Sequence, residues 1–196
     1  MPITINGNGT ISGLSAGGLP NGSVTNDTLA TTARPLFRSL AILEHYEAHG
    51  TNGQAITTAD TWTDKILTRI YMDPDSIVSL SNNQFTLQAG TYYINWATTF
   101  FEVDRCQSRL KNVTDDTVVK HSQNSFAQNS TAHVMIQPEG DARITIASAK
   151  TFKIQVFIDN LAPATNQELG IAGSASANNA GSEELFGRVL IYKENV

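Results

Sequence analysis

The chain has 196 residues, a formal net charge of −5 and only 16% charged residues. Because it is acidic and its few Lys and Arg residues are scattered, nucleic acid is excluded as a default partner. Cys106 is the single cysteine, which excludes an intrachain disulfide and a cysteine-based zinc site. No apolar run reaches membrane length, and no basic-then-apolar leader follows Met1, so we expect synthesis in the cytoplasm without a membrane partner.

Residues 1–33 are expected to form an extended arm. Their apolar side chains are isolated among Gly, Ser and Asn, and are too few to offset chain entropy with a core of their own. They recur more regularly than in a flexible spacer, although a disordered linker is the alternative. We therefore expect attachment to another protein surface, or to a sister subunit, through Ile3, Ile5, Ile11, Leu14, Leu19 and Val24.

Residues 34–50 are expected to form a short helix followed by a hinge. Pro35 stands where a first-turn proline is tolerated, and Gly50 stands where a helix stops. An apolar stripe along this helix either packs on the chain's own β domain or meets its copies at a trimer axis. The stripe consists of Leu36, Leu40 and Leu43.

Residues 51–196 have the two-residue period of β-strands, separated by turn-forming residues at 73–75, 81–83, 114–116 and 138–141. Many short strands without intervening helical patterns predict an all-β jelly-roll sandwich of about eight to ten strands. The candidate strands are 55–58, 65–72, 77–80, 84–88, 91–103, 105–113, 117–121, 132–137, 142–147, 151–159 and 184–193.

The densest aromatic cluster lies in residues 85–97, where two strand-like runs meet at a turn around Gly90. In the second run Tyr92, Ile94 and Trp96 share one parity, so one face of that strand is expected to be buried. These three side chains are candidates either for the core of the domain or for the trimer axis.

The histidines do not match a metal site. His45 and His49 are four residues apart on the expected helix, but the intervening Glu of a metalloprotease helix and a third ligand are missing. We interpret both as surface residues of that helix. His121 and His133 flank a loop and are equally unspecific.

Paired acids are the other candidate chemistry, and they occur as Asp73 with Asp75, Asp115 with Asp116, and Glu183 with Glu184. The two Asp pairs stand in sequences that form turns through their own side chains. Neither a nucleophile elbow nor a lysine-bearing phosphate loop is present. The sequence therefore assigns no catalytic residue, no metal ligand and no cofactor, and predicts that the chain is not an enzyme.

Two stretches of the chain resemble known families. Residues 85–94 and 185–192 are similar to the apolar–Gly–x–Tyr strand and the final Phe-x-Gly strand of the tumour-necrosis-factor and complement globular-domain superfamily. This resemblance implies a trimeric jelly roll. Residues 3–14 and 17–24 are similar to an arm that precedes such domains in virion proteins of tailed bacteriophages, called tail fibres, head fibres or capsid decoration proteins.

Together these features predict a non-enzymatic homotrimer located in the virion. The first hypothesis is a capsid decoration (cement) protein, whose arm binds the major capsid protein or another virion protein. The alternative is a short tail-fibre or receptor-binding module that recognises a host surface glycan or protein. That alternative requires exposed aromatics in the distal loops, where only Phe126 stands. A polysaccharide hydrolase is the third hypothesis, and it lacks a convincing carboxylate pair.

Overall fold

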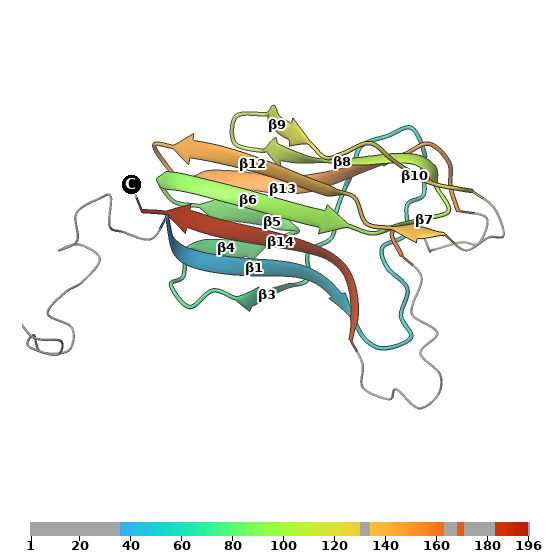
Figure 1. Ribbon diagram of the computed structural model, residues 1–196, viewed down its shortest axis with the longest axis horizontal. Helices are drawn as coiled ribbons and strands as arrows, with labels where there is room; N and C mark the ends of the chain where they lie inside the picture. The colour runs from blue at the N-terminus through green and yellow to red at the C-terminus, as the bar shows by residue number, and fades with distance from the viewer. Residues whose placement is uncertain (1–35, 130–133, 163–167, 171–182, 196) are drawn as a thin grey trace, which may run out of the picture. The chain divides into compact units, whose positions relative to one another are not determined.

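A computed structural model describes residues 36–129, 134–162, 168–170 and 183–195. These residues belong to one compact unit, Leu36–Val196, and form two stacked β-sheets with a small two-stranded ribbon at one end (Figure 1). The described residues contain fourteen strands and no helix. The predicted all-β sandwich is confirmed.

The first sheet has five strands in an antiparallel ladder. Its strand order differs from the chain order, because β6 lies between two strands from the C-terminal half of the chain. Across the sheet the order is β12 (Glu139–Ile146), β6 (Gly90–Thr98), β14 (Glu184–Glu194), β1 (Phe37–Glu47) and β3 (Arg69–Met72).

The second sheet has seven strands, of which five form a continuous path. The path is β10 (Ser125–Ala127), β8 (Asp104–Asn112), β13 (Lys150–Ile158), β5 (Gln84–Leu87) and β4 (Val78–Ser81), while β9 (Thr117–His121) pairs with β8 and β2 (Thr63–Asp64) with β13. The ribbon pairs β7 (Phe100–Phe101) with β11 (Met135–Ile136). Because β5 and β6 lie in different sheets, the turn before Gly90 carries the chain from one layer to the other.

The expected helix over 34–50 is wrong for its described part, because residues 37–47 form strand β1. Ala41 and Leu43 point into the sandwich and are fully buried, while Leu40 and Ile42 lie on the opposite face. A strand that is apolar on both faces loses the two-residue alternation by which strands are recognised. The segment is also rich in residues with high helix propensity, such as Leu, Ala and Glu, so its apolar residues fit the spacing of an amphipathic helix. Pairing with β14 and β3 overrides that local preference.

The core lies between the two sheets, and β6 supplies its largest side chains. Tyr92, Ile94 and Trp96 are all fully buried, so the predicted parity of this strand is confirmed. Trp96 also joins the layers, because its Nε1 donates a hydrogen bond to Ser108 Oγ on β8 at 2.9 Å. The Tyr92 hydroxyl donates to the carbonyl of Gln88 at 3.0 Å, which keeps its polar end satisfied.

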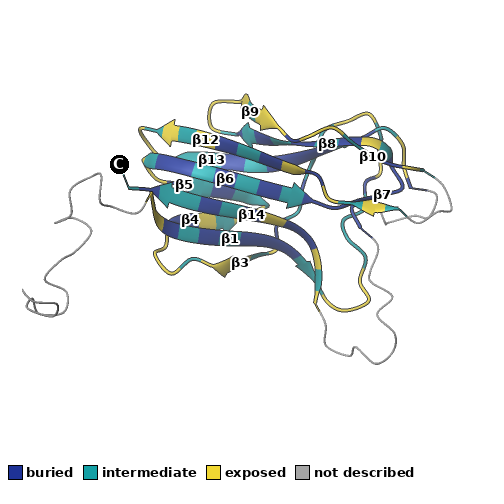
Figure 2. Ribbon diagram, in the orientation of Figure 1, coloured by how far each residue is buried: buried dark blue, intermediate teal, exposed yellow. Residues whose placement is uncertain are grey.

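The strand predictions are correct in their order and wrong at several boundaries. The turn expected at 138–141 is largely strand, because β12 begins at Glu139. The strand expected at 55–58 is absent, and only an isolated bridge joins Gln54 to Leu169 in this region. Strand β10 was not predicted, and part of the expected strand 132–137 lies outside the described residues. Strands β3 and β9 are largely exposed, whereas β6 alternates between buried and half-buried residues along most of its length (Figure 2).

Replacing Gly140 with Ala is expected to lower the free energy of unfolding by about 1–3 kcal/mol or more. A Cβ at this position would lie 2.2 Å from Cζ2 of Trp96, whose ring is fully buried and cannot retreat. Chemical denaturation measures the change. Asp141→Ala, at the next position and on the other face of β12, is the control and should stay within about 0.5 kcal/mol of the parent protein. A G140A protein as stable as the parent would contradict this packing.

Candidate functional site

The residues predicted to attach to a partner, Ile3, Ile5, Ile11, Leu14, Leu19 and Val24, lie outside the described residues. The residues predicted for a trimer interface fall into two groups. Leu43, Tyr92, Ile94 and Trp96 are 0% exposed and pack inside the sandwich of a single chain. For these four, the core alternative is the one that the structure shows. Leu36 is 65% exposed, and Leu40 is half-buried on the outer face of β1.

The outer face of the five-stranded sheet carries a continuous apolar and aromatic surface, which we call the aromatic face. It is built by cross-strand pairs, because Tyr192 on β14 stands between Leu40 on β1 and Tyr93 on β6. Leu190 pairs with Ile42 in the same way. Such neighbouring pairs stabilise a sheet and also present a combined apolar surface. The aromatic face consists of Phe37, Leu40, Ile42, Tyr93, Leu190 and Tyr192.

Three aromatic rings gather at one end of this face. The Phe37 ring centroid lies 5.0 Å from that of Tyr192 and 6.3 Å from that of Tyr93, and the two tyrosine rings are 6.3 Å apart. All three contacts are tilted, the geometry that aromatic pairs prefer. Phe37 remains 36% exposed and both tyrosines are half-buried. The cluster is therefore accessible to a partner.

Ion pairs border the aromatic face at both ends. Glu44 is only 2% exposed because Arg69 and Arg188, on the two neighbouring strands, close over it with hydrogen bonds of 2.7–3.2 Å. At the other end Arg143 holds Glu194 through two hydrogen bonds of 2.7 Å. These hydrogen bonds keep the pKa of Glu194 below its usual range. Both of these bordering carboxylates are therefore neutralised by arginines of the same chain.

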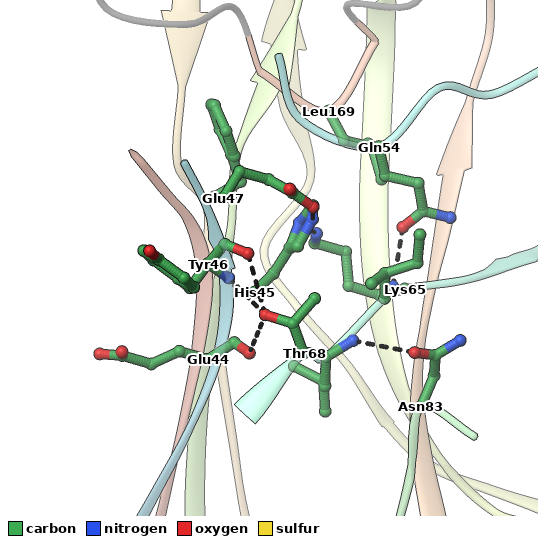
Figure 3. A network of polar contacts seen from close by, with 12 residues as sticks. Glu44, His45, Tyr46, Glu47, Gln54, Lys65, Thr68, Asn83 and Leu169 are labelled. Atoms are coloured by element: carbon green, nitrogen blue, oxygen red, sulfur yellow. Dashed lines mark hydrogen bonds and ion pairs between the residues drawn. The ribbon is translucent and has the colours of Figure 1, made fainter. Parts of the chain in front are cut away.

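A second polar group lies between the sheets, at the end of β1 (Figure 3). Lys65 is 0% exposed, and its Nζ donates a hydrogen bond to Nδ1 of His45, which is also 0% exposed. The other ring nitrogen, Nε2, donates to Glu47 Oε1 at 3.1 Å. The imidazole thus links a buried ammonium to a carboxylate at the surface. We call this arrangement the Lys–His–Glu relay.

Gly187 lies close to the buried side chain of Lys65. A Cβ there would lie 3.1 Å from Cε of Lys65, so a larger residue at this position of the Phe-x-Gly strand would require the lysine side chain to shift. Burial and, as the smaller cause, the positive charge of Lys65 together lower the pKa of His45 to about 3. Burial also lowers the pKa of Lys65, while the charge of Glu47 opposes that shift. His45 is therefore a buried strand residue, and its interpretation as a surface helix residue is wrong.

The remaining candidate groups serve local structure. Asp73 accepts backbone hydrogen bonds from Ile77 at 2.9 Å and Val78 at 3.1 Å, as a turn-forming acid does. Cys106 is buried, and burial raises the pKa of its thiol to about 12. Among the described residues no group of three or more His, Cys, Asp and Glu side chains is arranged to hold a metal ion. Nor does any helix there have the length and apolar character to span a membrane.

No protein-family model matches the chain, and no curated protein matches it significantly. Murine APRIL at pH 5.0 has a TM-score of 0.51 at 9% identity, over 79% of this chain and 98% of that one. Murine APRIL at pH 8.0 has a TM-score of 0.50 at 6% identity, over 79% and 98%. The globular domain of zebrafish complement 1qA protein has a TM-score of 0.45 at 15% identity, over 80% and 96%. At these identities the likeness shows the fold alone, a jelly-roll β-sandwich.

His45→Gln is expected to flatten the loss of stability on acidification. Below pH 6.5 an unfolded chain protonates its histidine, whereas folded His45 stays neutral until about pH 3. Stability from this group is therefore complete above pH 6.5 and falls as the pH drops toward about 3, by up to about 1.4 kcal/mol per pH unit. Denaturation midpoints between these pH values measure the slope. His121→Gln, at an exposed histidine, is the control. Equal slopes for the H45Q and parent proteins would contradict the buried neutral imidazole.

Proposed function

We propose that this chain is a non-enzymatic structural protein of a tailed-bacteriophage particle, and specifically a trimeric capsid decoration protein. Three copies pack with their aromatic faces turned toward a common axis. Residues 1–33 of each copy bind the capsid, with the major capsid protein as the first candidate partner. The protein is assembled into the virion in the host cytoplasm.

The observation that carries the trimer is the aromatic face. In a single chain this face has no covering layer among the described residues, although three aromatic rings and three aliphatic side chains lie side by side on it. Contiguous exposed apolar surface of this kind marks an association site. The resemblance of the β-region to trimeric jelly rolls supports a second and third copy as the cover.

The virion role is supported by the resemblance of residues 3–14 and 17–24 to phage virion arms. An extended arm with isolated apolar residues is suited to grooves and exposed sheet edges on a capsid lattice. Three arms held on one trimer bind far more tightly than a single arm, because the second and third contacts become intramolecular. Weak individual contacts are therefore sufficient for stable decoration.

Tyr192→Glu is expected to convert the trimer into a folded monomer, since it places a charge within the cluster of three rings, on the middle strand of the sheet. Light scattering coupled to gel filtration measures the mass, and circular dichroism checks the fold. Val118→Glu, at an exposed position on β9 in the other sheet, is the matched control and should leave the trimer intact. A parent protein that is monomeric, or a Y192E protein that remains trimeric, would refute the proposed interface.

Deleting residues 1–32 is expected to leave a folded trimer that no longer binds particles. Co-sedimentation with empty capsids measures binding, and light scattering measures the mass of the free protein. Unfolding or dissociation of the truncated protein would show that the arm belongs to the trimer and is not a tether.

Particles labelled through the C-terminus provide the test of location. Electron microscopy is expected to show label on the heads, arranged as regular clusters. Label confined to the tails would overturn the decoration role and favour the tail-fibre alternative.

A further inference from the structure

A surface groove lies on the seven-stranded sheet, on the layer that does not carry the aromatic face. It has a volume of about 590 Å³. Its lining comes from β8, from β10 and the residue before it, and from Phe157 of β13, and both β10 and β13 pair with β8. The lining residues are Arg105, Cys106, Gln107, Asn124, Ser125, Phe126 and Phe157. The groove is large enough for one or two sugar rings and too small for a folded partner.

Two phenyl rings line this groove. Phe126 on β10 is 57% exposed, although a phenylalanine of this kind ordinarily finds a place in the core. Phe157 pairs across the strands with Gln107, and its ring lies 5.5 Å from that of Trp62. The Trp62 ring in turn lies 4.0 Å below the guanidinium of Arg109. The aromatic lining is thus held in place by its neighbours, and Phe126 is the ring that offers an open face.

Two amides stand beside the rings and are pre-oriented. Gln107 Nε2 donates to Asn124 Oδ1 at 2.7 Å and to the carbonyl of Ser122 at 3.0 Å, which uses both of its N–H groups. Its Oε1, and Nδ2 of Asn124, have no hydrogen-bond partner among the described residues. The groove therefore carries one acceptor and one donor, on two amides that the Nε2–Oδ1 hydrogen bond joins.

The charge of the groove is balanced. Arg105 is the charged residue of the lining, and its Nη1 is paired with Asp159 Oδ2 at 3.1 Å. An anionic ligand would have to compete with that carboxylate. The ring face, the adjacent donor and acceptor, and the neutral balance together fit a ligand that has an apolar C–H face and vicinal hydroxyl groups.

We infer that this groove binds a neutral glycan, with one pyranose ring stacked on Phe126 and two adjacent hydroxyls bonded to Gln107 and Asn124. One hydroxyl donates to Gln107 Oε1 and the next accepts from Asn124 Nδ2. This site does not depend on the proposed trimer, because it lies on the other sheet. A single shallow site of this kind binds at about millimolar strength.

Saturation-transfer NMR on the full-length protein tests the inference. The probes are glucose, galactose, mannose, N-acetylglucosamine and lactose, with N-acetylneuraminic acid as the acidic probe and phenol as the apolar probe, each at about 10 mM. At least one neutral sugar is expected to receive saturation, strongest at the C–H protons of one ring face.

Two variants locate the binding. Phe126→Ala is expected to abolish the transfer, and Asn124→Ala to weaken binding about fivefold through the lost hydrogen bond. Tyr71→Ala, at an aromatic residue 61% exposed on the other sheet, is the matched control and should bind as the parent does. Both replaced groove residues are exposed, so the fold is expected to survive, and circular dichroism verifies it.

Three results would overturn the inference. One is the absence of transfer to every neutral sugar, whether or not phenol or the acidic sugar binds. Another is transfer that persists unchanged in the F126A protein. The third is equal loss in the Y71A control, which would show that binding does not occur in the groove.

Discussion

The five-stranded sheet has two apolar faces, and the described part of the chain covers only one of them. The inner face of β6 carries Tyr92 and Trp96 against the second sheet, where they are fully buried. The outer face of the same sheet carries Tyr93 and Tyr192, which stay partly exposed. Full burial of a large apolar side chain such as Phe contributes about 1.5–3 kcal/mol of favourable free energy. An uncovered cluster of aromatic side chains therefore favours association with a partner that buries it. The proposed trimer follows from this constraint.

The same constraint explains the unusual ion pairs at the border of that face. An acid on an open sheet face normally remains solvated, yet Glu44 is almost completely covered by Arg69 and Arg188. Burying a carboxylate is costly unless it is paired and hydrogen-bonded, and here two strands each supply a guanidinium. Removing either arginine would leave a partly unpaired buried charge at the end of the aromatic face that lies away from the three rings. These ion pairs therefore form the polar border of the aromatic face at the end where Glu44 lies.

The sequence predicts the sandwich correctly. Its prediction is wrong for β1, a strand that is apolar on both of its faces. The sequence predicts strand β6 because Tyr92, Ile94 and Trp96 share one parity, and the structure buries all three. Strand β1 was read as a helix because Leu40, Ala41, Ile42 and Leu43 are apolar on both faces, and periodicity cannot distinguish that pattern from a helical stripe. For the same reason the sequence leaves open whether Tyr92, Ile94 and Trp96 belong to the core or to a trimer axis, and the structure places them in the core. Parity identifies the two faces of a strand but does not say which one meets the second sheet.

The Lys–His–Glu relay was missed, although one signal was available. Lys65 shares its parity with Leu67 in a run expected to be strand, and both are buried. A buried lysine requires a hydrogen-bond partner for its amino group. That partner, His45, lies 20 residues earlier, in the segment for which the sequence predicts a helix. Because the partner came from the misassigned segment, the pair was not seen. Local pattern reasoning finds residues that need a partner, but only the paired strands identify it.

The two sheets also separate two kinds of recognition. A face buried in the proposed trimer would be unavailable to other ligands, so a separate ligand site is expected on a surface outside that interface. The groove at Phe126 and Gln107 meets that condition, since it is built on β8, β10 and β13. Its features are also different in kind, because balanced charge and paired amides favour a small polar ligand, whereas the aromatic face favours a large apolar one. A trimer that buries the aromatic face would carry three copies of the groove on its outer surface. Three weak sites on one trimer bind a multivalent glycan more tightly than a single site does.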